Sequence, residues 1–301
     1  MKKRIFIVLA VAMLIVPLAA FAAQDDVPKN IIILIGDGMG TAQVTAARIV
    51  KGQLELERCT VGGLVATHSA NNLVTDSAAG GTALATGHRT SNGMVALAPD
   101  GSELKTLLEY AHEAGKASGV VVTCSITHAT PATFLAHVDN RSKQSVIAEQ
   151  IAAGTADVLL GGGWGFFVPQ SVQGSKRNDN KDVLAELGKR MPVALTIEDL
   201  RALEDAESFA GLLAPDYLQW AEDRNPSLAE MVSLALNALS KNPNGFALMV
   251  EGAHIDWAGH DNDEKNLLGE MVDFDDAVGA ALDFAEADGN TLVVVTSDHD
   301  T

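Results

Sequence analysis

Short continuous runs of apolar residues recur along the chain and predict the strands of a buried sheet. The runs lie at 30–35, 119–123, 157–160, 246–250 and 291–296. They are rich in Val, Ile and Leu and do not alternate regularly with polar residues. Strands of this kind are typical of parallel sheets that are covered by helices on both faces.

Segments with helical periodicity separate these runs, at 104–114, 142–152 and 265–287. Ser227 and Glu230 have the spacing of a capping box, which predicts a helix that begins there and ends near Ser240. This alternation of strand and helix predicts the α/β class, as a doubly wound, mostly parallel sheet with helices on both faces.

The segment 164–224 interrupts the alternation. It is polar and contains turn-forming pairs such as Gly174-Ser175 and Asn178-Asp179. We expect an insertion or lid over the sheet rather than a separate domain.

The N-terminal segment 1–22 has the pattern of a signal peptide. Three basic residues, Lys2, Lys3 and Arg4, precede an apolar run at 5–20, and Ala20-Phe21-Ala22 gives a small-x-small cleavage pattern. The run is short for a membrane span, so we expect cleavage and no stable membrane anchor. The mature domain, 23–301, would then be periplasmic or extracellular.

The charge balance excludes one class of partner. The whole chain has a formal net charge of −18, and without the three basic residues at the start it keeps 18 basic and 39 acidic residues, or −21. Nucleic acid would be repelled by this charge. A small phosphate ester remains compatible, because bound divalent cations can reverse the local field.

The only two cysteines, Cys59 and Cys124, do not have the spacing of a zinc thiolate site. Both a disulfide between them and two free thiols remain open. We expect no catalytic role for either.

Polar residues that follow the predicted strands suggest a metal site, because ligands of doubly wound sheets bind beyond the carboxyl ends of the strands. Asp256 and His260 also have the i, i+4 spacing that places two side chains on one helical face. Singly, each is an ordinary turn or loop residue, but four clusters together predict metal binding. His and carboxylate ligands suit Zn²⁺, and an all-oxygen set suits Mg²⁺. The polar residues that follow the predicted strands are Asp37, His128, Thr130, Arg141, Glu251, Asp256, His260, Asp298 and His299.

Ser77 is the candidate nucleophile. Small residues surround it in the run TDSAAGGTA, at the predicted start of a helix that ends near Gly87. The free N–H groups and the dipole of a helix N-terminus favour a phosphate there. Locally, an N-capped, Ala-rich helix explains the run equally well. The run lacks a Gly-x-Ser-x-Gly elbow, which disfavours a hydrolase triad of that type.

Five segments, from Asn30 to the last residue, together resemble the successive signature segments of the alkaline phosphatase family. They are IIILIGDGMG, VTDSAAGGTALATG, THATPATFLAHVDNR, VEGAHIDWAGH and TSDH, in the order of the family. The resemblance implies hydrolysis of phosphate monoesters to an alcohol and inorganic phosphate, through a phosphoserine on Ser77.

The resemblance also implies two Zn²⁺ ions and one Mg²⁺ ion. The ion beside Ser77 would be held by Asp37, Asp298 and His299, and the second zinc ion by Asp256 and His260. Mg²⁺ would share Asp37 with Thr130 and Glu251. Arg141 matches the arginine that grips the phosphate, as a planar guanidinium can do with two oxygens at once.

The sequence departs from the family pattern in two respects. His128 and Trp257 occupy positions beside the metal site that vary within the family and tune its metal preference, and His128 would favour zinc in place of magnesium. A histidine that would complete the second zinc site is expected beyond the Asp298-His299 pair, but the sequence stops at Thr301. We therefore expect a fragment of a longer protein, with a C-terminal part missing.

Two other functions remain as alternatives. The first is a truncated or inactive family member that binds metal and phosphate without turnover. The second, disfavoured by Arg141, is a phosphodiesterase. A homodimer stays open as the oligomeric state.

Overall fold

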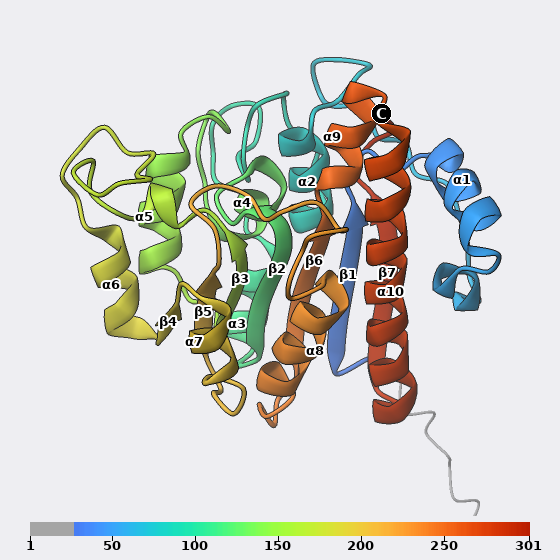
Figure 1. Cartoon of the computed structure of the whole chain (residues 1–301). Coiled ribbons are helices and arrows are strands. Elements are labelled where there is room, and N and C mark those ends of the chain that lie inside the picture. The colour runs from blue at the N-terminus through green and yellow to red at the C-terminus, as the bar shows by residue number, and fades with distance from the viewer. Residues whose placement is uncertain (1–26) are drawn as a thin grey trace, which may run out of the picture.

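Seven parallel strands form one sheet in the order β4-β5-β3-β2-β6-β1-β7 (Figure 1). The computed structural model describes residues 27–301, so the predicted signal peptide at 1–22 lies outside the described residues. The strands are β1 Asn30–Gly36, β2 Ala117–Ser125, β3 Val158–Gly162, β4 Val193–Ala194, β5 Phe209–Leu212, β6 Phe246–Gly252 and β7 Thr291–Ser297.

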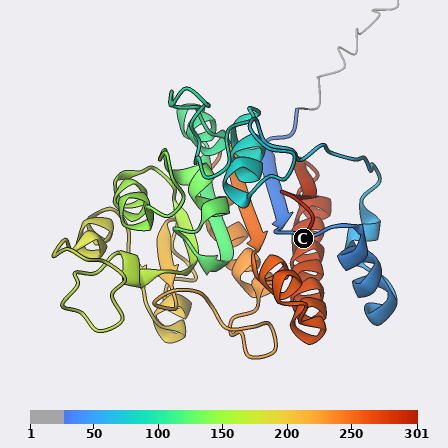
Figure 2. The same cartoon turned by 90° about the horizontal axis from the view of Figure 1, so that it is seen from above.

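Helices cover both faces of this sheet (Figure 2). The α-helices are α1 Thr41–Lys51, α2 Ser77–Thr86, α3 Leu107–Glu113, α4 Ala129–Leu135, α5 Gln144–Ala153, α6 Val183–Arg190, α7 Ile197–Arg201, α8 Leu228–Leu239, α9 His254–Asp261 and α10 Glu264–Asp288. Two short 3₁₀ helices are η1 Glu55–Arg58 and η2 Trp164–Phe166.

The alternation of side chains along each strand divides the core into two layers. Val120 and Val122 of β2 point to the layer filled by α2 to α6, whereas Val121 points to the layer filled by α7, α8 and α10. The central strands are buried throughout, as the continuous apolar runs predict. The predicted doubly wound α/β architecture is confirmed, as is the capping box of Ser227 and Glu230 at the start of α8.

The segment 164–224 differs in part from the expectation of a lid. It contains β4 and β5, which extend the sheet beyond β3. These strands have two and four residues, too few to give a hydrophobic run of their own. Part of the segment is therefore sheet rather than a cover over the sheet.

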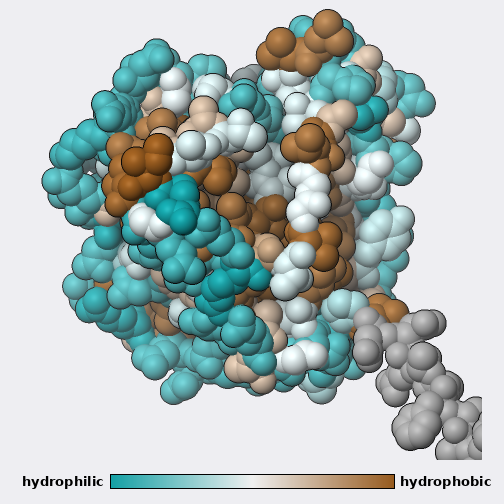
Figure 3. Space-filling view, turned by 90° about the vertical axis from the view of Figure 1, so that its right-hand side faces the viewer, coloured by the Kyte–Doolittle hydropathy of each residue, from teal (hydrophilic) through white to brown (hydrophobic). Residues whose placement is uncertain are grey.

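At the opposite edge, β7 is less covered than the strands beside it. The side chains of Leu292 and Val294 are exposed, and the surface seen from this side carries several apolar areas (Figure 3). Between residues 27 and 301, no helix is both long and apolar enough to cross a membrane.

The carboxyl ends of the strands lie together at one edge of the sheet, at the top of Figure 1, with α2 and α9 beside them. Segments that are far apart in the sequence meet here because all strands run in the same direction.

Candidate active site

The helix α2 places Ser77 at its first position. Asp76 is the N-cap residue, and its side chain accepts a hydrogen bond of 3.0 Å from the backbone N–H of Ala79. Gly87, with φ 76°, ends the helix in the left-handed conformation. Ser77 is buried, and its Oγ lies 3.3 Å from Nε2 of His299, which follows β7. The helix start predicted around Ser77 is therefore confirmed.

Asp37, Asp298 and His299 gather beside Ser77, at the ends of the neighbouring strands β1 and β7. Nε2 of His299 is 3.4 Å from a carboxylate oxygen of Asp37 and 3.4 Å from one of Asp298. One ligand atom from each of the three residues lies within 4.8 Å of the others. The backbone N–H of Gly38 donates to Asp298 over 3.2 Å, which fixes that carboxylate.

Two glycines allow this close approach. Gly38 has φ +66°, and a Cβ there would lie 2.7 Å from Oδ1 of Asp256. A Cβ on Gly80 of α2 would lie 2.8 Å from the backbone oxygen of Asp298. The absence of side chains at these positions lets the nucleophile helix pack directly on the loop that carries Asp298.

Arg141 contacts Asp76, the residue that precedes Ser77, and is anchored by two hydrogen bonds. Its Nη1 donates to Oδ2 of Asp76 over 3.2 Å, and its backbone N–H donates to the oxygen of Gly93 over 2.8 Å. Its Nη2 is 3.4 Å from Nε2 of His128. The guanidinium is thus held at the N-cap of α2 while about 29% of the Arg141 side chain stays exposed.

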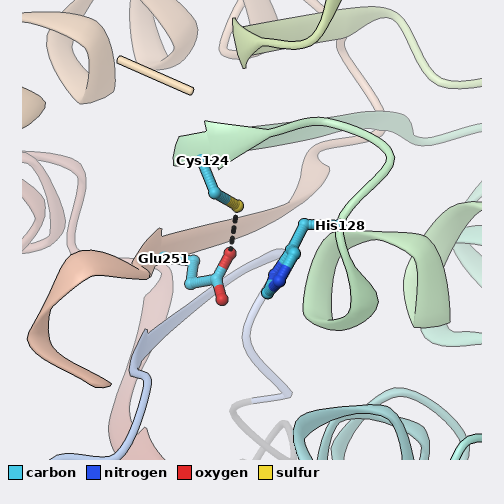
Figure 4. A group of neighbouring side chains, drawn as sticks. All are labelled: Cys124, His128 and Glu251. Carbon is cyan, nitrogen blue, oxygen red and sulfur yellow. Dashed lines mark hydrogen bonds between the residues drawn. The ribbon is translucent and has the colours of Figure 1, made fainter. Parts of the chain in front are cut away.

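A second group lies close to Asp37 and contains Cys124, His128 and Glu251 (Figure 4). Cys124 is near the end of β2, His128 is the N-cap residue of α4, and Glu251 is near the end of β6. The Sγ of Cys124 donates to Oε2 of Glu251 over 3.3 Å. Thr130, in the first turn of α4, is fully buried.

Asp256 and His260 share one face of α9, as their spacing predicts. Nε2 of His260 is 3.5 Å from Oδ1 of Asp256. His260 is largely exposed, and with Trp257, Trp220 and Tyr217 it lines a shallow hollow of about 450 Å³. Within the described part of the chain, this pair is not joined by another His, Cys, Asp or Glu in a group of three.

Buried oxygen atoms without hydrogen-bond partners test whether this site fits a metal. Within residues 27–301, such oxygens at this site belong to Asp37, Thr130, Glu251 and Asp298, and both carboxylate oxygens of Asp37 are among them. Such atoms are costly in a protein interior unless something compensates them. Divalent cations would do so, and the oxygen-rich donor set suits them. The residues present therefore fit the metals that the resemblance implies.

The protonation states agree with this interpretation. Burial, together with the charges of Asp298 and Glu251, raises the pKa of Asp37 well above its usual range. Burial also raises the pKa of Asp298, and that of Glu251 to about 8. Burial and the charge of Arg141 lower the pKa of His128 to about 3, so its imidazole is neutral and has a lone pair to offer.

Behind the site, a buried ionic network holds His254, which the sequence did not single out. Arg224 and Glu270 form an ion pair of 2.5 Å, and Nη2 of Arg224 is 3.2 Å from Nδ1 of His254. His254 stacks on Trp257 with 4.4 Å between ring centroids, and Trp257 meets the ring of His128 edge to face at 5.7 Å. The network thus supports the residues around His128.

Sequence reasoning placed most of these residues at the correct edge of the sheet but missed Cys124. Cys59 and Cys124 are both free thiols, so the open question of a disulfide is answered in favour of free cysteines. A usable signal was the position of Cys124 only four residues before His128, at the end of a predicted strand.

Comparisons with known proteins agree with the fold and with the motifs. The family model described as alkaline phosphatase matches residues 28–301. Alkaline phosphatase 3 of Bacillus subtilis is 41% identical over 298 residues, which cover 92% of this chain but 62% of that protein. The chain thus spans less than two thirds of the length of this relative.

Among solved structures, the alkaline phosphatase from the Antarctic bacterium TAB5 is 40% identical, with a TM-score of 0.85 over 91% of this chain and 80% of that one. A histidine-to-glutamate variant of that enzyme, described as having Mg bound in its M3 site, has a TM-score of 0.86 at 40% identity and covers 91% of this chain and 79% of that one. With a family model that matches nearly the whole described chain, and with relatives of this similarity, the chain belongs to the alkaline phosphatase family.

Proposed function

We propose that this chain carries the active site of an exported, metal-dependent phosphatase that hydrolyses phosphate monoesters through a phosphoserine on Ser77. One observation carries the proposal. The hydroxyl of Ser77 lies at a helix N-terminus, 3.3 Å from His299 of the Asp37, Asp298 and His299 group, on the side where Arg141 is held by Asp76. A nucleophile, a set of metal ligands and a phosphate clamp thus converge on one point.

Arg141, the start of α2 and Ser77 each have a separate role in the proposed reaction. Arg141 binds two phosphoryl oxygens with its planar guanidinium, and the N–H groups at the start of α2 face the same phosphate. The Ser77 oxygen attacks phosphorus while the alcohol leaves from the opposite side, and water then releases phosphate from the phosphoserine. Divalent cations at the ligand groups would neutralise charge on the phosphoryl group and favour the ionised form of the Ser77 hydroxyl.

The proposed ligand sets follow from the geometry and the family resemblance. Asp37, Asp298 and His299 would hold one Zn²⁺, and Asp256 and His260 would contribute to a second. Mg²⁺ would be held by the oxygen ligands Asp37, Thr130 and Glu251. His128 and Trp257 lie beside this last position and would tune its metal preference.

Export is the remaining part of the proposal. It rests on the basic start, the apolar run and the cleavage pattern of residues 1–22. Detection of a mature N-terminus near Ala23, in protein recovered outside the cytoplasm, is the expected result. Recovery of the uncleaved chain from the cytoplasm would contradict it.

The test of the activity compares two substrates and two serine variants. The purified chain is incubated with Zn²⁺ and Mg²⁺, and hydrolysis of an aryl monophosphate is compared with that of an aryl phosphodiester. We expect faster turnover of the monoester, its loss in Ser77→Ala, and no change in Ser233→Ala, because Ser233 is an exposed residue of α8. Trapping at acid pH followed by peptide mass analysis should place phosphate on Ser77.

A second candidate function is binding of metal and phosphate without turnover. The two-membered Asp256 and His260 pair favours it, because two protein ligands hold zinc weakly. Phosphate binding without hydrolysis would support this candidate. Faster hydrolysis of the diester would contradict both readings.

A further inference from the structure

Cys124 is the one residue of the candidate site that the family resemblance leaves without a role. In the sheet, Glu251 of β6 is paired with Val122 of β2, and Cys124 lies two residues further along the same strand. Because alternate residues of a strand share a face, the thiol and the carboxylate point into the same layer. His128 enters that layer from the start of α4, and the three side chains converge (Figure 4).

The distance between Cys124 and Glu251 is close to that between two ligands of one small ion. The Sγ of Cys124 is 3.3 Å from Oε2 of Glu251, and one ligand atom from each of the three residues lies within 4.8 Å of the others. A thiolate sulfur at about 2.3 Å and a carboxylate oxygen at about 2.1 Å from the same zinc ion are about 3.6 Å apart at the tetrahedral angle.

Two unpartnered atoms show that the group is open to a ligand. Nδ1 of His128 and Oε1 of Glu251 are buried, and neither has a hydrogen-bond partner within residues 27–301. Nε2 of His128 already faces Arg141, so Nδ1 is the nitrogen that is left for a metal. Arg141 itself does not depend on this contact, because Asp76 also holds it.

We infer that Cys124, His128 and Glu251 hold Zn²⁺ as a thiolate, imidazole and carboxylate site, in place of Mg²⁺ on oxygen ligands alone. Sulfur and nitrogen ligands select zinc, whereas magnesium prefers oxygen and retains its waters. On binding, the Cys124 thiol loses its proton to solvent, a sulfur–metal bond forms, and the hydrogen bond to Glu251 is given up. No electron is transferred.

This inference rests on the proposed metal-dependent function, but it can be tested without catalysis. The other proposed ligand groups, Asp37 with Asp298 and His299 and Asp256 with His260, contain no sulfur. A signal from a metal–sulfur bond therefore reports on the Cys124 position alone.

The experiment uses Co²⁺ as the probe. The full chain is freed of metal by chelation and titrated with Co²⁺ while the near-ultraviolet thiolate-to-cobalt charge-transfer band is recorded. We expect this band in the unmodified chain and in Cys59→Ser, which removes the chain's other thiol. The band should be absent in Cys124→Ser and Cys124→Ala. Zn²⁺ should displace the bound Co²⁺, and a large excess of Mg²⁺ should not.

Three results would overturn the inference: no band in the unmodified chain, a band that survives in Cys124→Ser, or displacement by Mg²⁺ as readily as by Zn²⁺. Circular dichroism of the metal-free variants shows whether they fold. His128→Ala, which keeps the thiol, should weaken Zn²⁺ binding here by at least the roughly 10–100-fold that loss of an outer-shell partner costs. A cobalt–sulfur band without phosphatase activity would contradict the proposed function, and it would still support metal binding by Cys124.

Discussion

Asp76 and Arg141 form an ion pair in which Oδ2 and Nη1 are 3.2 Å apart. The same carboxylate caps the helix that begins at Ser77. One side chain therefore fixes both the helix that carries Ser77, the proposed nucleophile, and the guanidinium that is proposed to bind the phosphate.

The two tasks of Asp76 can be separated by Asp76→Asn. The amide oxygen can still cap α2, so the free energy of unfolding should change by less than about 1 kcal/mol. Arg141 loses its charged partner and is less well placed, so inhibition by inorganic phosphate should weaken roughly fivefold, which corresponds to about 1 kcal/mol. The control is Asp182→Asn, because Asp182 caps α6 in the same way, with a hydrogen bond of 3.0 Å from Ala185. Equal phosphate inhibition in both variants would contradict the role given to Asp76.

The stability of the metal-free chain should fall as pH rises from about 6.5 to about 8, above the range in which the buried His128, with its pKa lowered to about 3, has the opposite effect. Burial raises the pKa of Glu251 to about 8, and it also raises those of Asp37 and Asp298. In this range the folded chain keeps the proton of Glu251, which the unfolded chain has already lost, so unfolding is favoured as pH rises, by up to about 1.4 kcal/mol per pH unit.

Urea unfolding in a chelator at several pH values measures this trend. Saturating Zn²⁺ should reverse it, because a cation stabilises the ionised carboxylates and binds only the folded chain. A metal-free chain that is more stable at pH 8 than at pH 6.5 would show that these carboxylates are not held as the structure places them.

Gly80→Ala should weaken metal binding beside Ser77, although Gly→Ala usually stabilises a helix. The new Cβ would lie 2.8 Å from the backbone oxygen of Asp298, so either α2 or the Asp298 loop must move, at a cost of about 1–3 kcal/mol. Gly188→Ala in α6 is the matched control, because a Cβ there meets nothing within 4 Å and should stabilise the chain by about 0.5–1 kcal/mol. Zinc titration and urea unfolding of both variants distinguish the two effects. Equal stabilisation by both substitutions would be inconsistent with the close packing of α2.

Glu270→Gln should destabilise the fold more than an exposed carboxylate substitution. Glu270 and Arg224 are both buried, and loss of the charge leaves Arg224 with Asp273 as its remaining ionic partner. Breaking a buried pair costs about 3–5 kcal/mol, and the remaining partner favours the lower value. Glu186→Gln, which breaks the exposed pair with Lys189, should cost less than about 0.5 kcal/mol. The comparison is made by urea unfolding, and similar values for the two variants would contradict the role of the network.

The sequence predicted the five longer strands because each is a continuous apolar run, and four of these strands are largely buried, whereas β7 is partly exposed. It missed β4 and β5 because strands of two and four residues gain their place from pairing with β3, not from a pattern of their own. The helix start at Ser77 was predicted correctly from the small residues around it.

In the candidate site, too, some residues were predicted from the sequence and others were missed. Asp37, Glu251 and Asp298 were found because each follows a recognisable strand. Cys124 was missed because its chemistry depends on the register that brings it to Glu251, which lies 127 residues further along the chain. The spacing of four residues between Cys124 and His128 was a usable signal for that pair, but it carries no information on Glu251.

The central position of β1 has a consequence for how the chain folds. Asn30 at the start of β1 accepts a hydrogen bond from Phe246, 216 residues away, and its side chain donates to Thr291, 261 residues away. β1 therefore cannot pair with β6 and β7 until most of the chain has been synthesised. Such long-range pairing slows folding and leaves apolar surface exposed meanwhile. Asp37, at the end of β1, should thus be among the last ligands to reach its place, so metal binding should report completion of folding rather than guide its early steps.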